Sequence, residues 1–484
     1  MLFNSFHFAF FFPAVVAVYF LSPQALRAAV LAFAGYYCCM AAHPVFGVVL
    51  FLVTVVGYAG AWALSFLTNH TGRRLVLGLA VLLALAPLFF LKYFGLFHGV
   101  LAAVFLPIGV SFPEPAAHPW VPIGLSFYSL VIVGYLLDVH AGRQLAESRL
   151  DRFAAFASFF PLLAAGPIER GPRLLPQLGE RHVFDYDRVT RGLTLMTWGL
   201  FKKVVVADRL AVMVDSAYGA PSTRPGPAMA LAVLFYTYQI YCDFSGYTDM
   251  AIGAAQILGF RVMSNFDRPY SASSVSEFWR RWHISLSSWF RDYVYIPLGG
   301  NRVSTLSWVG VIVLVFAASG LWHGARWTFV VWGLLHAAFL IIQRLSGPSR
   351  SRWGTSAFPR LWHGASVLLT FLCVALAWVV FRSESLGQAG AVYGALCRGW
   401  ANAENWDILH RSYTLFGVSP AVCALGLGLI VFLEGAQAFG ARCGWSERLS
   451  RQPRLVRWAV YSAGLWAIFV LGSFTQKEFI YVVF

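Results

Sequence analysis

A histidine interrupts one of the longest apolar runs of the chain. Residues 305–345 are about twice as long as one membrane crossing, and the segment SGLWHGAR (319–326) stands in their middle. Because glycine tolerates unusual backbone geometry and close approach of a ligand, we expect a helix break at His323, whose ring then faces a cavity and not lipid. There an imidazole can act as a general base near neutral pH. The alternative is a histidine that only caps the helix. His336 is interpreted as a packed structural histidine.

A second histidine lies in the segment 265–302, which is rich in aromatic and basic residues. Ser274 and Glu277 have the spacing of a capping box and predict the start of a helix. Aromatic residues follow at helical spacing, with His283 next to Trp279 on one continuous face. Two interpretations stay open. The helix is an interfacial anchor that buries its histidine, or it lines the entrance to a reaction chamber.

Two carboxylates, Asp243 and Asp249, stand inside a further apolar run. Six residues apart, they do not share a helical face well, so a paired acid–base role is a weak interpretation. We expect each to bond a cation from elsewhere and so to hold helices together. The candidate cations are Lys202, Lys203, Arg209 and Arg268.

The composition indicates which class of protein must position these side chains. Of 484 residues, 59% are hydrophobic and 12% are charged, against about 25% charged in an average soluble domain. Such a chain is too apolar for a soluble or a disordered protein and is predicted to be an all-α polytopic membrane protein. Seven cysteines, an odd number without CxxC or zinc-ligand spacing, predict neither a disulfide framework nor a metal site.

The net charge of +15 is assigned to cytoplasmic loops that face anionic lipid, not to nucleic-acid binding. The basic loops 344–360 and 442–457 are predicted to be cytoplasmic, which places the loop 383–413 outside. The run at 153–165 is short for a span and is predicted to be re-entrant or interfacial. The predicted apolar runs are 6–22, 25–42, 44–67, 75–91, 95–111, 121–137, 153–165, 192–206, 228–260, 305–345, 361–381, 414–433 and 458–474.

Residue chemistry alone leaves two classes of function open. A histidine in a water-poor cavity can take the proton of a hydroxyl that attacks an activated acyl group. The same histidine also suits a transporter with a proton relay.

The chain resembles the membrane-bound O-acyltransferase (MBOAT) family, in particular its bacterial polysaccharide branch. The resemblance rests on DRPYSASSVSEFWRRWHISLSSWFRDYVYIPLGGNR (267–302) and SGLWHGARWTFVVWGLLHA (319–337), with support from AGPIER (165–170) and GLFKKVVVADRL (199–210). It implies one integral-membrane domain over 1–484, with a catalytic core at about 120–345 and C-terminal helices at about 361–484. The implied fold has roughly 11 transmembrane helices plus re-entrant and interfacial helices around a central tunnel.

The resemblance also implies an activity. The family's signature histidine matches His323, the implied base or transient acetyl carrier, and its second polar position matches His283. Acetyl groups would pass from cytoplasmic acetyl-CoA, a substrate and not a bound cofactor, across the bacterial inner membrane to an exported polysaccharide such as alginate or cellulose. A periplasmic SGNH-type partner is implied, for which the loop 383–413 is the expected docking surface. The expected donor-binding residues are Arg280, Arg281, Trp279, Lys202, Lys203 and Trp322.

Several alternatives to this activity stay open. An acyl-carrier protein could be the donor, with D-alanine passing to teichoic acid, or the acceptor could be a lipid or a protein. Outside acyl transfer, the alternatives are a polytopic transporter and a scaffold for the periplasmic partner.

Overall fold

The computed structural model describes residues 1, 3–106, 121–347, 359–443, 449, 451–474 and 479, and every regular element within these ranges is a helix. This confirms the predicted all-α class. The α-helices are α1 (Phe6–Leu21), α2 (Arg27–Met40), α3 (Pro44–Phe66), α4 (His70–Leu88), α5 (Phe94–Phe105), α6 (Leu125–His140), α7 (Leu150–Ala157), α8 (Phe160–Leu163), α9 (Gly171–Gly179), α10 (Tyr186–Leu200), α11 (Asp208–Gly219), α12 (Gly226–Leu258), α13 (Val275–Arg281), α14 (Ile284–Phe290), α15 (Thr305–His323), α16 (Trp327–Leu345), α18 (Pro359–Arg382), α19 (Leu386–Leu396), α20 (Ser412–Phe416), α21 (Pro420–Cys443) and α23 (Arg454–Leu471).

Among the described residues, seven helices are long and apolar enough to cross a membrane. They are α3, α4 with its continuation to Gly99, α15, α16, α18, α21 and α23. The shorter α1 and α6 are also apolar. A multi-pass membrane protein is thereby confirmed, whereas the number of eleven spans stays a prediction. The predicted short element at 153–165 consists of two short helices, α7 and α8.

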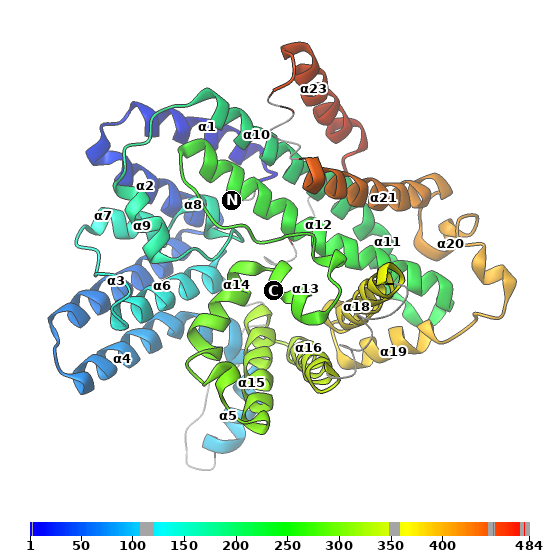
Figure 1. Cartoon of the computed structure of the whole chain (residues 1–484), viewed down its shortest axis with the longest axis horizontal. Coiled ribbons are helices and arrows are strands. Elements are labelled where there is room, and N and C mark those ends of the chain that lie inside the picture. Colours follow the sequence, from blue (N-terminus) through cyan, green and yellow to red (C-terminus); the bar gives the residue numbers. More distant parts are fainter. Residues whose placement is uncertain are drawn as a thin grey trace.

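The 33-residue helix α12 runs through the middle of the molecule (Figure 1). At 1.5 Å per residue it is about 50 Å long, more than the hydrocarbon thickness of a bilayer. It packs along α10 and α11, and most of its side chains are buried. In Figure 1, α1–α4 and α6–α9 lie on its left, α11 and α18–α21 on its right, and α13–α16 below it. Phe244 on this central helix contacts His283, with ring centroids 4.7 Å apart, so α12 forms one wall of the region that holds this histidine.

Three π-helical turns interrupt the described helices. They are η2 (Phe89–Tyr93), η4 (Phe201–Ala207) and η7 (Arg291–Tyr295). A π-helical turn shifts the register of the side chains that follow, and such turns are frequent at functional sites. Polar side chains lie in each of the three turns, namely Lys92 in η2, Lys202 and Lys203 in η4, and Asp292 in η7.

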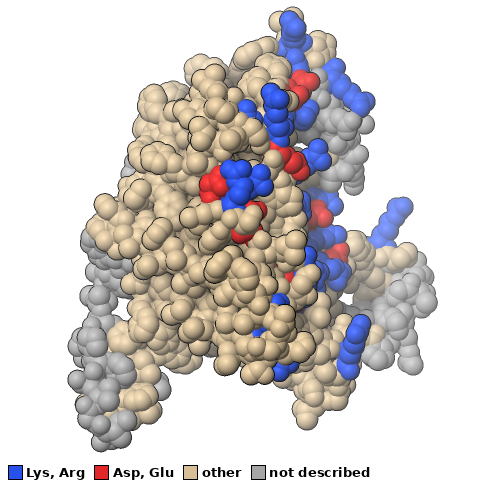
Figure 2. All heavy atoms as spheres, turned by 90° about the vertical axis from the view of Figure 1, so that its left-hand side faces the viewer, with Lys and Arg blue, Asp and Glu red and all other residues tan. Residues whose placement is uncertain are grey.

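Lys and Arg side chains gather along one edge of the molecule in the view of Figure 2, whereas the rest of this surface is mostly uncharged. Such a one-sided distribution is typical of a membrane protein whose basic side faces the cytoplasm. Of the two predicted cytoplasmic loops, residues 348–358, 444–448 and 450 lie outside the described residues. The orientation itself stays a prediction.

Candidate functional site: two buried histidines at helix breaks

Two adjacent helices place His323 at a helix break. Helix α15 ends at this histidine and α16 begins at Trp327, which confirms the break predicted from the flanking glycines. A Cβ atom at Gly320 would overlap the carbonyl oxygen of Phe329 on α16. The absence of a side chain at Gly320 therefore lets the backbones of α15 and α16 approach closely.

A second break carries His283. Helix α13 starts where the capping pattern predicts, because Ser274 Oγ accepts a hydrogen bond from the backbone N–H of Glu277 at 3.2 Å. The prediction of one continuous helix beyond it is wrong, since α13 ends at Arg281 and α14 begins at Ile284. His283 between them has φ 42° and ψ 55°, the left-handed region. For a non-glycine residue this costs about 1–2 kcal/mol, and such strain clusters at functional sites.

Asn265 holds the strained histidine in place. Its Oδ1 accepts hydrogen bonds from the backbone N–H of Ser285 at 3.2 Å and from Ser285 Oγ at 2.7 Å, and it lies 3.2 Å from His283 Nδ1. Because the Ser285 N–H only donates, the contacted atom of Asn265 is the amide oxygen, and Nδ1 of His283 must be the donor. In the neutral ring, Nε2 then carries the lone pair. Asn265 was not among the site residues predicted from the sequence.

The two breaks bring the imidazoles together. The ring centroids of His283 and His323 lie 6.4 Å apart with an interplanar angle of 59°. The two residues are only 0% and 3% exposed, and aromatic rings pack around them. Phe127 and Phe244 contact His283, Trp332 and Phe381 contact His323, and Trp322 contacts both. His323 therefore faces protein rings and not lipid, and the tunnel implied by the resemblance stays a prediction.

Of the two tryptophans expected at the site, the structure places only Trp322 directly against the histidine pair. Its Nε1 donates to the backbone oxygen of Ser126 at 3.2 Å, and its ring centroid lies 5.8 Å from that of His283. Trp279 donates instead from Nε1 to Nδ1 of His336 at 3.3 Å. His336 is fully buried among rings, in agreement with its interpretation as a packed structural histidine.

The two lysines of η4 form buried ion pairs with helix α12. Lys202 Nζ lies 2.8 Å from Asp249 Oδ2, and Lys203 Nζ lies 2.6 Å from Asp243 Oδ1. Lys203 Nζ also lies 2.9 Å from Asp208 Oδ1. The predicted pairing of each carboxylate with a cation is confirmed. These contacts fasten η4 to α12 and engage both ammonium groups that were expected to bind the donor.

The two arginines of α13 lie at the C-terminal turn of that helix. Arg281 forms an ion pair of 2.6 Å with Glu277, and its Nη1 donates to Ser271 Oγ at 2.7 Å. Arg280 Nη1 donates to Ser276 Oγ at 3.1 Å, and its side chain is exposed. Both precede His283 by two or three residues.

A cavity of about 570 Å³ lies at the other end of the segment that starts at His283. It is lined by Asp138, Arg143, Arg170, Pro172, Arg173, Asp292, Tyr293 and Ile296. From His283, α14 and η7 lead over nine residues to Asp292, which is about 14 Å of helix. This segment thus connects the histidine pair with a second polar region of the protein.

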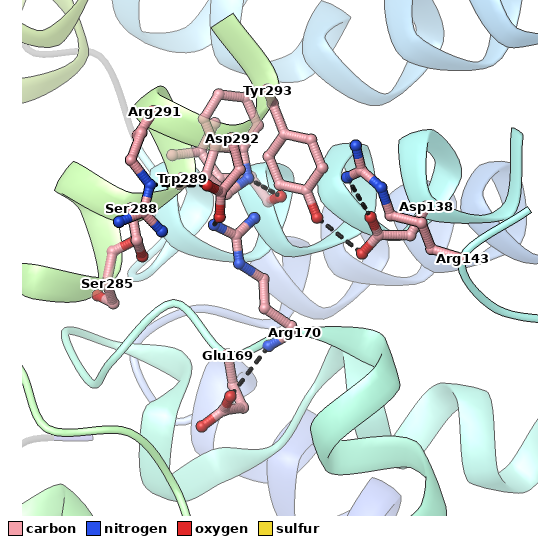
Figure 3. A network of polar contacts seen from close by, with 11 residues as sticks. Asp138, Arg143, Glu169, Arg170, Ser285, Ser288, Trp289, Arg291, Asp292 and Tyr293 are labelled. Atoms are coloured by element: carbon pink, nitrogen blue, oxygen red, sulfur yellow. Dashed lines mark hydrogen bonds and ion pairs between the residues drawn. The ribbon is translucent and has the colours of Figure 1, made fainter. Parts of the chain in front are cut away.

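Figure 3 shows how the cavity residues are linked. Arg170 forms an ion pair of 3.4 Å with Asp292 and stacks over the ring of Tyr293, with its Cζ 4.4 Å from the ring centroid. The hydroxyl of Tyr293 donates to Asp138 at 2.7 Å, and Asp138 forms an ion pair of 3.0 Å with Arg143. Nη1 of Arg170 is buried and has no hydrogen-bond partner among the described residues. None of these arginines was predicted from the sequence to have a role, and AGPIER (165–170) was only a supporting motif of the family resemblance.

The cavity lies toward the basic side of the molecule. Tyr295, at the end of η7, donates to Asn301 Oδ1 at 2.7 Å, and Arg344 Nη1 donates to the same atom at 3.5 Å. Arg344 belongs to the last turn of α16, where the basic loop 344–360 begins. The cavity end of the α14–η7 segment is therefore on the side predicted to be cytoplasmic.

Comparison with known proteins shows which protein family this sequence matches. The sequence model of MBOAT, the membrane-bound O-acyltransferase family, matches residues 136–377, which include both histidines. The probable alginate O-acetylase AlgI of Pseudomonas aeruginosa is 38% identical over 403 residues, covering 82% of this chain and 75% of that protein. The peptidoglycan O-acetyltransferase of Helicobacter pylori is 35% identical and covers 56% of each chain. A teichoic acid D-alanyltransferase of Streptococcus thermophilus is 28% identical over 54% of this chain and 68% of its own.

Proposed function

This chain belongs to the membrane-bound O-acyltransferase family, and from that premise we propose that it transfers acetyl groups to hydroxyl groups of an exported polysaccharide. The proposal is carried by one observation, the pair of buried histidines with ring centroids 6.4 Å apart within the matched region. The names of the alginate and peptidoglycan relatives support acetyl as the acyl group and a glycan as the acceptor.

In the proposed reaction, His323 takes the proton of the acceptor hydroxyl while its oxygen attacks the thioester carbonyl of acetyl-CoA. The carbon–sulfur bond then breaks, and the leaving thiolate takes the proton from the imidazolium, so that the products are an acetyl ester and free CoA. His283 assists through Nε2, the lone-pair nitrogen that its contact with Asn265 defines, by accepting a hydrogen bond from a second, neighbouring hydroxyl of the acceptor and so orienting it. Because aromatic rings enclose both imidazoles, the substrates reach them only after some of these rings move apart.

The donor is proposed to enter through the cavity of about 570 Å³. Arg143, Arg170 and Arg173 line it, and guanidinium groups suit the phosphates of coenzyme A. The buried Nη1 of Arg170 is a donor that an anion can use. All of these cations pair with carboxylates, but the side chains of Arg143 and Arg173 are about half exposed, whereas those of Lys202 and Lys203 are at most 5% exposed. We therefore assign the anionic part of the donor to the arginines of the cavity and not to the lysines.

The acetyl group is proposed to leave on the opposite side of the bacterial inner membrane. A periplasmic SGNH-type partner that docks on the segment 383–413, which contains α19, would pass it to the glycan. A hydroxyl that itself reaches the histidine pair would be acetylated without such a partner. Deleting the partner in cells separates the two routes, because only the first loses acetylation.

Histidine substitutions test the proposed function. His323→Ala and His283→Ala are compared with His336→Ala, which removes a third fully buried histidine outside the pair. The acetyl ester content of the exported polymer is measured by mass spectrometry and divided by the amount of protein in the membrane. We expect loss of acetylation for the first two variants and nearly normal values for the third. Near-normal acetylation by His323→Ala at normal protein level would refute the assignment.

Purified protein separates the remaining alternatives. Release of CoA from acetyl-CoA supports the proposed donor, whereas turnover of only a D-alanyl carrier protein supports the more distant D-alanyltransferase likeness. Solute flux in vesicles that contain no acetyl-CoA would indicate a transporter.

A further inference from the structure

Lys92 lies against the end of the helix that carries His323. Lys92 belongs to the π-helical turn η2, which follows α4. Its ammonium donates to the backbone oxygens of Trp322 at 3.1 Å and His323 at 3.2 Å, and to Ser126 Oγ at 3.1 Å. Among the described residues, these three oxygens are its hydrogen-bond acceptors, and no carboxylate forms an ion pair with it.

The counter-charge of Lys92 is the C-terminus of α15. The last four carbonyls of a helix have no partner within the helix, and together they carry about half a negative charge. Lys92 meets two of these carbonyls, those of the last two residues of α15. A cation in a membrane-spanning segment is costly and needs such a partner. The buried lysines Lys202 and Lys203 are instead held by carboxylates of α11 and α12.

Two neighbouring hydrogen bonds also hold the C-terminal end of α15. The hydroxyl of Tyr93 also donates to the backbone oxygen of Trp322, at 3.3 Å. Nε1 of Trp322 donates in turn to the backbone oxygen of Ser126, the second residue of α6. The end of α15 is thereby tied to η2 and to the start of α6 immediately before its chain leaves the helix at His323.

We propose that Lys92 is a positioning residue for acyl transfer, whose ammonium fixes the terminal turn of α15 and so holds His323 against His283. This inference rests on the proposed role of His323 in the reaction. It concerns a residue outside the matched region 136–377. A catalytic group displaced by about 1 Å loses roughly 100-fold in rate, so we expect Lys92 to affect the rate and not the affinity for the donor.

The experiment compares Lys92→Met, Lys92→Arg and a matched control, Arg73→Met. Arg73 stands on the same helix, 19 residues or about 28 Å earlier, and also donates to carbonyls at helix ends, those of Leu64 and His140. The readouts are the melting temperature in detergent and the rate and KM of acetyl-CoA turnover in membranes. His323→Ala is measured beside them.

We expect Lys92→Met to melt like the wild type, because methionine removes the desolvated cation together with its bonds. Its rate at saturating acetyl-CoA should fall about 10- to 100-fold with unchanged KM, and Lys92→Arg should recover part of the loss. A wild-type rate for Lys92→Met, or a loss no larger than that of Arg73→Met, overturns the proposal. If Lys92→Met does not accumulate, Tyr93→Phe decides. A lower rate of Tyr93→Phe at the wild-type melting temperature supports the positioning role of these contacts at the end of α15, and a wild-type rate contradicts it.

These results separate this inference from the proposed function. Full activity of His323→Ala means that the proposed function fails. An inactive His323→Ala beside a fully active Lys92→Met means that only the positioning role fails.

Discussion

Removing the ammonium of Lys203 should destabilise the protein more than removing either of its acidic partners. Its Nζ lies 2.6 Å from Asp243 and 2.9 Å from Asp208, and all three side chains are at most 5% exposed. Breaking a buried ion pair from one side costs about 3–5 kcal/mol, because an uncompensated charge stays behind. Lys203→Met leaves two carboxylates in this position and belongs at the upper end of that range. Asp243→Asn leaves Lys203 paired with Asp208 and keeps an amide oxygen near the ammonium, so we expect about 1–3 kcal/mol.

The assay is thermal unfolding in detergent, followed by tryptophan fluorescence, together with the KM for acetyl-CoA of the protein that remains folded. The expected order of melting temperatures is wild type, then Asp243→Asn, then Lys203→Met. Combining Lys203→Met with Asp243→Asn and Asp208→Asn should recover part of the loss, because neutral groups replace the whole charged cluster. The KM for the donor should be unchanged in each variant.

One outcome would refute this reasoning. If Lys203→Met melts like the wild type and raises the KM for acetyl-CoA, the lysine binds the donor, as the sequence analysis expected, and its ion pairs are not what holds η4 to α12. A lower melting temperature with an unchanged KM assigns Lys203 to structure alone.

Three further predictions use matched pairs of variants. Gly320→Ala should lower the melting temperature because its Cβ meets the backbone of α16, whereas Gly310→Ala on the same helix, with no atom within 4 Å of the added Cβ, should change the stability by less than about 1 kcal/mol. His283→Gly should accumulate better than His283→Ala, since glycine adopts φ 42° without strain, yet both should lose acetylation in the polymer assay. Arg170→Met should raise the KM for acetyl-CoA several-fold, whereas Arg149→Met, which removes an exposed ion pair with Asp151, should leave the kinetics unchanged.

The sequence predicted correctly those features that follow from the free-energy cost of placing charged residues in an apolar environment. The high hydrophobic and low charged fractions together predicted a membrane protein, and the cost of a bare carboxylate predicted that Asp243 and Asp249 would pair with cations. The break at His323 could be predicted because Gly320 and Gly324 mark it locally. The structure confirms each of these features.

The break at His283 could not be predicted in the same way. The residues around it, FWRRWHIS (278–285), contain neither glycine nor proline, and their spacing fits one helix. The break is stabilised by a residue distant in sequence. The side-chain oxygen of Asn265 accepts hydrogen bonds from Ser285, and the backbone oxygen of Asn265 accepts the N–H of Ile284 at 2.9 Å. The role proposed for Lys92 could not be predicted from the local sequence either. It falls between the apolar runs predicted at 75–91 and 95–111, where a lysine is normally a loop residue.

Both histidines stand where a helix stops or starts, and this position has a physical consequence. A residue inside a helix has its backbone bonded along the axis, whereas a residue at a break depends on side chains from elsewhere to satisfy its backbone. Asn265 provides these bonds beside His283, and Lys92 provides them at the carbonyl of His323. Because His323 is the last residue of α15 and His283 lies between α13 and α14, we expect these polar contacts to help set the distance between the two rings. Substitutions that remove these contacts are therefore expected to change the reaction rate before they change the fold.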